Sequence, residues 1–132
     1  EETSGRDTSA PYLSLNDNPP SFRGRRGLFE GPRRTRVGEP VNLVARIRHS
    51  EPGTWVKWTL HQGANAVVFS ESEARLGVAE GVIESTATFS QPGSYLLRIQ
   101  AINDTERRRE PTYGFEFHCC WTNGFLRVDV LE

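Results

Sequence analysis

The chain has 132 residues, of which 36% are hydrophobic and 25% are charged, and its formal net charge is -1. This length fits one domain with a tail, and the balanced charge excludes a general electrostatic attraction to nucleic acid or to an anionic membrane. The apolar runs are too short to span a bilayer, and the two cysteines are too few for a disulfide-rich scaffold.

Residues 1–31 are rich in Pro, Gly, Ser and Asn and show no sustained periodicity. Such a composition buries too little apolar surface to offset chain entropy. We therefore expect an extended N-terminal segment or linker, followed by a β-domain at residues 32–132, with residues 20–36 along a sheet edge. The candidate anchors of this segment are its large apolar residues: Tyr12, Leu13, Leu15, Phe22, Leu28 and Phe29.

The arginines between residues 23 and 36 form a basic tract, which consists of Arg23, Arg25, Arg26, Arg33, Arg34 and Arg36. One interpretation is a contact with an anion or a nucleic acid. Because the charge of the whole chain is balanced, we favour solvated arginines whose stems lie over apolar surface.

From residue 41 onward, apolar and polar residues alternate in short runs, the period typical of half-buried strands. These runs cover 41–47, 55–60, 66–69, 83–89, 95–101 and 125–131, with Pro/Gly turn sequences between several of them. Residues 70–80 are ambiguous, because Ser70 and Glu73 could form a capping box whereas Gly77 disfavours a longer helix. Short strands without a convincing helix predict an antiparallel β-sandwich.

Three stretches carry a family resemblance: Trp58, then Thr86-Ala87-Thr88-Phe89-Ser90, then Pro92-Gly93-Ser94-Tyr95-Leu96-Leu97-Arg98-Ile99-Gln100-Ala101. Together they resemble the PKD-like branch of the immunoglobulin-like domains, over residues 32–131. The chain departs from that branch at His61-Gln62-Gly63, where an aromatic-Gly-Asp-Gly turn is usual, and in extra residues before the last strand. The resemblance implies an immunoglobulin-like β-sandwich of a secreted or surface protein, without a particular ligand.

The aromatic residues of the central runs have different expected roles. Trp58 is predicted to lie in the core, and Tyr95 to pack near the start of its strand with its hydroxyl bonded to the backbone. Alternation places Trp55 on the opposite side from Trp58. Trp55 is then either covered by the N-terminal segment, which we favour, or exposed for stacking on a sugar.

Residues 105–124 form an insertion that the sandwich core does not require. Its aromatic spacing favours an ordered hairpin with the last strand, turning at Asn123-Gly124, with a contact site at its free end around 107–113. The alternative is an aromatic contact surface at one end of the sandwich. The candidate contact residues are Trp55, Arg107, Arg108, Arg109, Tyr113 and Trp121.

Cys119 and Cys120 are adjacent, and a vicinal disulfide between them needs a distorted peptide. The alternative is two reduced cysteines. A metal site formed with His118 is disfavoured, because neighbouring side chains on a strand diverge and the ligand spacing of structural zinc is absent. A Cys–His nucleophile has no supporting feature either.

The chain lacks a phosphate-binding glycine loop, a nucleophile elbow and a metalloprotease helix, so we predict no enzyme activity and no cofactor. Asn103-Asp104-Thr105 is a glycosylation sequon, which has meaning only in a eukaryotic secretory pathway. The absence of Met suggests a processed chain or an excised fragment.

We expect a non-catalytic module of an exported or cell-surface protein, extracellular or periplasmic, with a structural, adhesive or carbohydrate-contacting role. Its expected partners are a carbohydrate, another protein or neighbouring domains, and neither nucleic acid nor an inserted membrane. The alternatives are an accessory domain of a larger secreted hydrolase and a small metal-binding protein that uses His118, Cys119 and Cys120.

Overall fold

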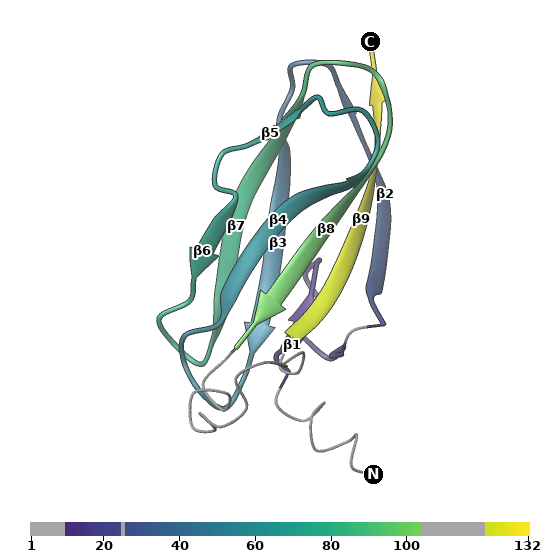
Figure 1. The fold of residues 1–132 in the computed structure, drawn as a ribbon. Coiled ribbons are helices and arrows are strands. Elements are labelled where there is room, and N and C mark those ends of the chain that lie inside the picture. The colour runs from purple at the N-terminus through teal and green to yellow at the C-terminus, as the bar shows by residue number, and fades with distance from the viewer. Residues whose placement is uncertain (1–9, 25, 104–120) are drawn as a thin grey trace, which may run out of the picture.

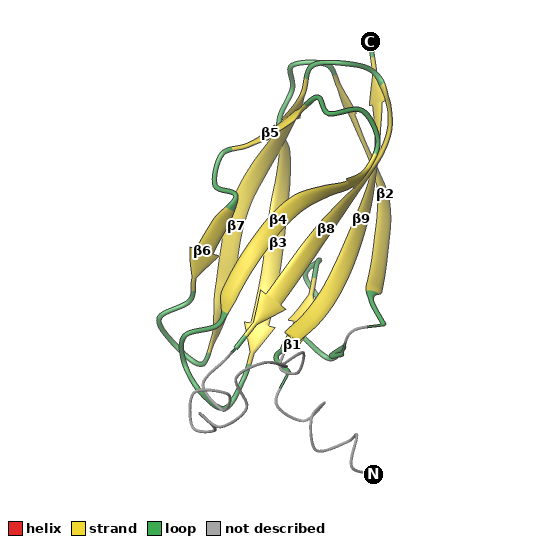
Figure 2. Cartoon of the chain, in the orientation of Figure 1, coloured by secondary structure: helices red, strands yellow, loops and turns green. Residues whose placement is uncertain are grey.

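The computed structural model describes residues 10–24, 26–103 and 121–132, which form two facing β-sheets and no helix (Figures 1 and 2). One sheet has the strand order β1-β3-β7-β5 and the other the order β2-β9-β8-β4-β6. Pairing is antiparallel except between β2 and β9, which run parallel. The strands are β1 (Tyr12–Ser14), β2 (Leu28–Arg36), β3 (Val41–Arg48), β4 (Trp55–Gln62), β5 (Val67–Phe69), β6 (Glu73–Arg75), β7 (Glu80–Phe89), β8 (Gly93–Ile102) and β9 (Trp121–Leu131).

Alternation along the strands fills the space between the sheets. On β3 and β8, every second residue is buried and its neighbours face outward. This pattern confirms the predicted strands, although β7 begins at Glu80 and β9 at Trp121, several residues before the alternating runs. The additional residues at both strand starts are paired with a neighbouring strand, Glu80 with Arg48 of β3 and Trp121 with Ile102 of β8.

The centre of the core is aromatic. Trp58 is 2% exposed, and the Phe89 and Tyr95 rings lie 4.5 Å apart. The Tyr95 hydroxyl donates a 2.7 Å hydrogen bond to the carbonyl oxygen of Gln91, four residues upstream. This contact matches the tyrosine corner of immunoglobulin-type sandwiches, and it confirms the roles predicted for Trp58 and Tyr95.

The described part of the N-terminal segment belongs to both sheets. β1 pairs with β3 and β2 pairs with β9, and the buried Leu13 and Leu15 contribute to the core. The domain boundary expected between residues 31 and 32 falls inside β2. The segment has too few apolar residues for a core of its own, yet it adds strands to sheets that the rest of the chain provides.

Two of the expected anchors behave differently. Leu28 packs against the core, whereas Phe29 lies outside the core on the other side of β2 and is 66% exposed. The buried hydroxyl of Thr122 also holds the segment, since it donates to the carbonyl of Pro11 and accepts from the amide of Gly24.

The stretch 67–75 passes from one sheet to the other, because β5 pairs with β7 and β6 pairs with β4. At the transition, the Ser70 hydroxyl accepts a 2.9 Å hydrogen bond from the Thr86 amide. The Ser85 hydroxyl accepts from the Glu71 amide and donates to the Glu71 carbonyl. The capping box considered for Ser70 is therefore wrong, since its oxygen is used by a neighbouring strand.

The predicted turn at Asn123-Gly124 is also wrong. Both residues lie inside β9, opposite Gln100 and Ile99 of β8. A Cβ on Gly124 would lie 3.0 Å from side-chain carbons of Leu13 and Leu15. The glycine therefore allows the N-terminal leucines to approach β9 closely, and the tertiary contact prevails over the local turn preference.

Candidate binding face

Three rings form a cluster on the outer face of the five-stranded sheet, and we call this cluster the aromatic platform. Phe29 of β2 lies opposite Phe125 of β9, with ring centroids 5.0 Å apart and planes inclined by 21°. His61 of β4 lies 5.0 Å from the Phe125 ring at an angle of 57°. Phe29 is 66% exposed and lies at the β2 side of the cluster, on the edge strand of the sheet.

Gly27 makes room for this platform. Its φ is +103°, and a Cβ at this position would lie 2.7 Å from a ring carbon of Phe125. The backbone conformation and the close approach both require glycine at this position. The backbone just before β2 therefore packs directly against the Phe125 ring.

Sequence reasoning missed the platform, because its members come from three strands. The alternation of apolar and polar residues within β2 or β9 does not show that these two strands pair in parallel. One part of the platform could have been predicted from the alternation along β9. Because Leu126, Val128 and Val130 point into the core, Phe125 points to the outer face of the sheet.

Basic residues outnumber acidic residues on the same outer face. Outward positions follow from the alternation with buried neighbours and from the strand registers. The acidic members are Glu73 and Asp129, and Arg127 lies 3.3 Å from the Asp129 carboxylate. The basic members are Arg34, Arg36, Lys57, Arg75, Arg98 and Arg127.

Arg98 lies beside the platform in a fixed position. It is the β8 partner of Phe125, so the two side chains project from adjacent strands on one face. Its Nε and Nη2 donate to the Asn123 side-chain oxygen at 3.3 and 3.0 Å. The guanidinium is therefore oriented, while its Nη1 has no hydrogen bond to the described residues.

Trp55 and Trp121 share this outer face near the ends of the strands. Ile102 of β8 lies between them, since it pairs with both. Arg75 of β6 covers Trp55, with its guanidinium 4.0 Å from the ring centroid. The cover that we expected from the N-terminal segment is thus provided by β6, through a cation–π contact.

The other predicted contact residues, Arg107, Arg108, Arg109 and Tyr113, lie outside the described residues. So do His118, Cys119 and Cys120, and the choice between a vicinal disulfide and two reduced cysteines stays open. Alkylation with and without reductant, followed by mass spectrometry, distinguishes these two states.

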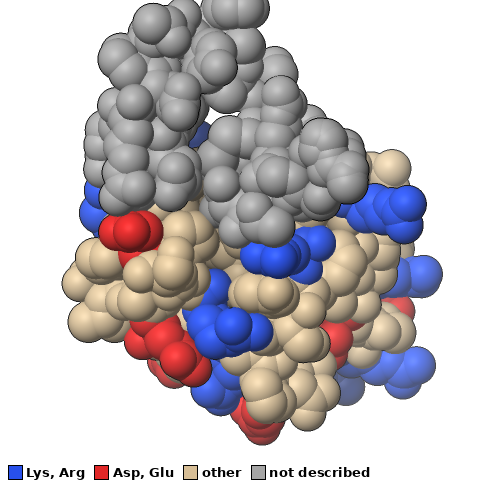
Figure 3. Space-filling view, turned by 90° about the horizontal axis from the view of Figure 1, so that it is seen from below, with Lys and Arg blue, Asp and Glu red and all other residues tan. Residues whose placement is uncertain are grey.

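Arg25 of the N-terminal tract lies outside the described residues, and the described arginines of the tract have separate contacts. Arg33 donates to the carbonyl of Asn42, Arg36 donates to the carbonyl of Glu132, and Arg23 lies over the Tyr12 ring. Seen from the end of the sandwich at the bottom of Figure 1, basic side chains lie on several sides, with acidic side chains between them (Figure 3).

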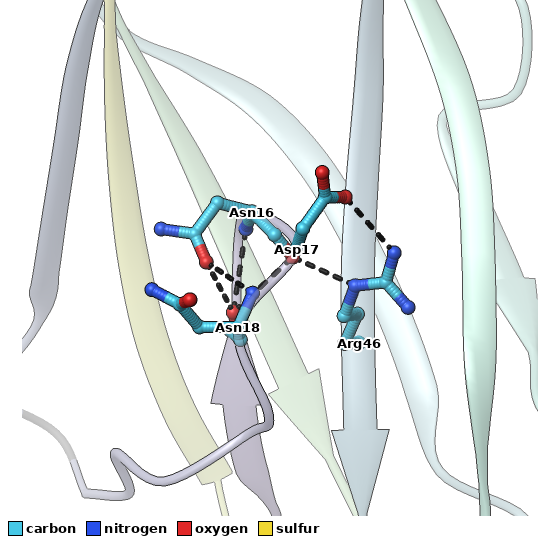
Figure 4. Close-up of polar contacts among 5 residues, drawn as sticks. Asn16, Asp17, Asn18 and Arg46 are labelled. Carbon is cyan, nitrogen blue, oxygen red and sulfur yellow. Dashed lines mark hydrogen bonds and ion pairs between the residues drawn. The ribbon is translucent and has the colours of Figure 1, made fainter.

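A loop of the chain itself lies over part of the outer face of the four-stranded sheet. Arg46 of β3 donates to the Asn16 carbonyl at 2.7 Å and to the Asp17 carboxylate at 3.1 Å (Figure 4). Asn18 donates through its amide to the Asn16 side-chain oxygen at 2.8 Å. The polar groups of this loop form hydrogen bonds with one another and with Arg46. We therefore interpret the loop as a structural element that covers part of β3.

Two open hollows lie on this four-stranded sheet. One has a volume of about 350 Å³ and lies beside Ser70, whose hydroxyl is occupied by the Thr86 amide. The other has a volume of about 250 Å³ and lies between the loop of Asp17 and the Glu80 region of β7. Neither hollow contains a His or Cys side chain in its lining, and we assign no chemistry to them.

Asn103 of the sequon is 1% exposed. Its side-chain nitrogen donates to the Thr54 hydroxyl at 3.0 Å and to the Glu51 carbonyl at 3.1 Å. A glycan would need this same nitrogen at the surface. Asn103 therefore has a structural role, because its buried side chain holds the loop before β4 through these hydrogen bonds.

The described residues contain no group of three or more His, Cys, Asp or Glu side chains placed to hold a metal ion. Within those same ranges, no helix of the length and apolarity needed to cross a membrane occurs.

Comparisons with known proteins found no matching family model and no matching curated protein. Among solved structures, the chain is similar to domains 4 and 5 of the S-layer protein SbsC, with 16% identity and a TM-score of 0.47 over 92% of this chain. It spans about half of that structure, 54%.

Two further similarities involve single domains. The CARDB domain of a Pyrococcus furiosus protein, solved in complex with di-metal ions, shows 17% identity and a TM-score of 0.48, over 94% of this chain and 97% of that one. The ASH/PapD-like domain of human CEP192 shows 11% identity and a TM-score of 0.49, over 96% of this chain and 88% of that one.

At these identities and scores, the similarities identify no family. The fold is defined by the strand order, the parallel β2–β9 pair and the Tyr95 corner. On these features the chain is an immunoglobulin-like β-sandwich domain.

Proposed function

We propose that this domain is a non-catalytic module of an exported or cell-surface protein, and that it acts by contact through the outer face of its five-stranded sheet. The observation that carries the proposal is Phe29, a large apolar ring that is 66% exposed and held by stacking on Phe125. Exposed aromatic rings held in a fixed orientation provide a flat surface on which a ligand ring can pack.

The aromatic platform favours a carbohydrate among the expected partners. The C–H groups on one side of a sugar ring carry small positive charges, which suit the negative face of an aromatic ring. The rings lie on strands rather than loops, so the surface is rigid and little ordering accompanies binding. An adhesive role through a protein partner or a neighbouring domain is the other outcome of the test below.

Within the immunoglobulin-like domains, we assign the chain to the PKD-like branch. The run of residues 92–101 supports this assignment, because it forms β8 and contains the corner residue Tyr95. The contact surface expected from Trp55, Trp121 and the insertion residues Arg107, Arg108, Arg109 and Tyr113 stays a prediction, separate from the aromatic platform.

Affinity gel electrophoresis tests the proposal. The domain is run through gels that contain neutral or acidic polysaccharides, and at least one of them should retard it. Phe29→Ala should strongly reduce the retardation without unfolding the domain, because the ring is mostly exposed. Val68→Ala is the matched control, since Val68 is 71% exposed on the other sheet.

Absence of retardation in every gel, or equal retardation of wild type and Phe29→Ala, would refute the carbohydrate contact. Export is tested separately by fractionating source cells. An antibody against the domain should detect it in the secreted or surface fraction, and detection confined to the cytosol would contradict the proposed location.

A further inference from the structure

We infer that the ligand of the outer face of the five-stranded sheet is a carboxylated polysaccharide, a chain built from uronic acid sugars. The inference rests on the proposed carbohydrate contact and goes further, because it names the class of sugar. It is carried by two features that lie together: the aromatic platform and the basic side chains around it.

The platform supplies the surface for a sugar ring. Because Phe125 stacks beside Phe29 and His61 lies against Phe125, the rings support one another from β2, β9 and β4. The exposed Phe29 ring therefore has a defined orientation before any ligand arrives. A sugar chain bound along this face would place the apolar side of one sugar unit on that ring.

The charge of the face selects for an anionic sugar. The chain as a whole carries -1, yet Lys and Arg outnumber Asp and Glu at the outward positions of this sheet. On the outer face of the four-stranded sheet, Glu80 and Glu84 of β7 lie beside Arg46 and Arg48 of β3. The excess of positive charge is thus local to the face that also bears the platform.

Arg98 is the group best placed for a carboxylate. It lies opposite Phe125, and Asn123 holds its guanidinium through two of the nitrogens. A planar guanidinium with a free edge matches a planar carboxylate and can donate two parallel hydrogen bonds. Phe125 lies between Phe29 on β2 and Arg98 on β8. In a uronic acid the carboxylate is attached to the sugar ring, so a sugar chain that crosses these strands can place one unit on Phe29 and the carboxylate of the next unit at Arg98.

Single-stranded nucleic acid also combines anionic groups with flat rings that stack on aromatic side chains. The exposed Phe29 ring could accept a base as well as a sugar, and the charge distribution favours the sugar. Nucleic-acid affinity depends mainly on neutralising many phosphates, whereas this chain has a net charge of -1 and carries Glu73 and Asp129 on the same face.

The test compares polygalacturonate with its fully methyl-esterified form, in which the sugar ring is the same and the negative charge is removed. Affinity gel electrophoresis and isothermal titration calorimetry should show binding to polygalacturonate and a loss of about tenfold or more on esterification. Phe29→Ala and Arg98→Gln should each weaken binding to polygalacturonate by about tenfold. Arg48→Gln, on the other sheet, is the matched control and should bind as wild type does.

Dextran sulfate and poly(dT) complete the comparison. Stronger binding of either one than of polygalacturonate would overturn the inference, because charge alone or a nucleic acid would then explain the face. Equal binding of polygalacturonate and its ester would overturn the acidic sugar but leave the proposed carbohydrate contact standing. Failure of every polysaccharide to bind would refute both. Melting curves of each variant confirm that losses do not arise from unfolding.

Discussion

Replacing Leu13 by Ala tests whether the N-terminal segment is part of the fold. Leu13 is 1% exposed, β1 pairs it with Ile47 of β3, and its amide donates to the carbonyl of Phe22 at 2.8 Å. The change removes three buried carbons, worth about 2.4 kcal/mol at roughly 0.8 kcal/mol each. A residual cavity beside Gly124 adds to this, so we expect a loss of about 3 kcal/mol.

Urea unfolding at 25 °C, followed by tryptophan fluorescence, measures this loss, and the melting temperature should fall by roughly 10 °C for a domain of this size. Phe29→Ala is the control from the same segment, because its mostly exposed ring and its stacking on Phe125 should together cost only about 1 kcal/mol. A loss below about 1 kcal/mol for Leu13→Ala would show that the segment is a dispensable linker.

Two further changes test the core and the loop clamp. Trp58→Ala should cost about 3–5 kcal/mol in urea unfolding, because it empties the largest buried site; a loss below about 1 kcal/mol would contradict the core assignment. Asn103→Ala should cost about 2 kcal/mol, since the buried Thr54 hydroxyl and the Glu51 carbonyl lose their donor. Unchanged stability of this variant would mean that water or another group replaces the amide.

The strands that could be predicted are those whose alternation is local and complete. β3 and β8 each bury every second residue, so their sequences alone specify the inward side. β2 lacks this pattern because polar residues occupy its inward positions, Glu30, Arg33 and Thr35, and because its register shifts between Glu30 and Arg33. Its place in the sheet depends on β9, which lies about a hundred residues further along the chain.

At Asn123-Gly124 the local sequence strongly predicts a turn, but the structure has a continuous strand. The dipeptide is typical of hairpin turns, but here the absent side chain accommodates Leu13 and Leu15. The candidate site has the same non-local origin, because Phe29, His61 and Phe125 meet only when three strands are aligned. Sequence periodicity indicates that each ring points outward or inward, but it does not show which rings meet.

The parallel pairing of β2 with β9 determines how the domain would resist stretching. The two strands run side by side, with the start of β2 at one end of the sandwich and the end of β9 at the other (Figure 1). A pulling force applied between Leu28 and Leu131 acts along the strands and across their hydrogen bonds. These bonds would be loaded in shear and would have to break together, not one after another as in an opening zipper. In a tether exposed to flow or traction, this geometry would delay mechanical rupture.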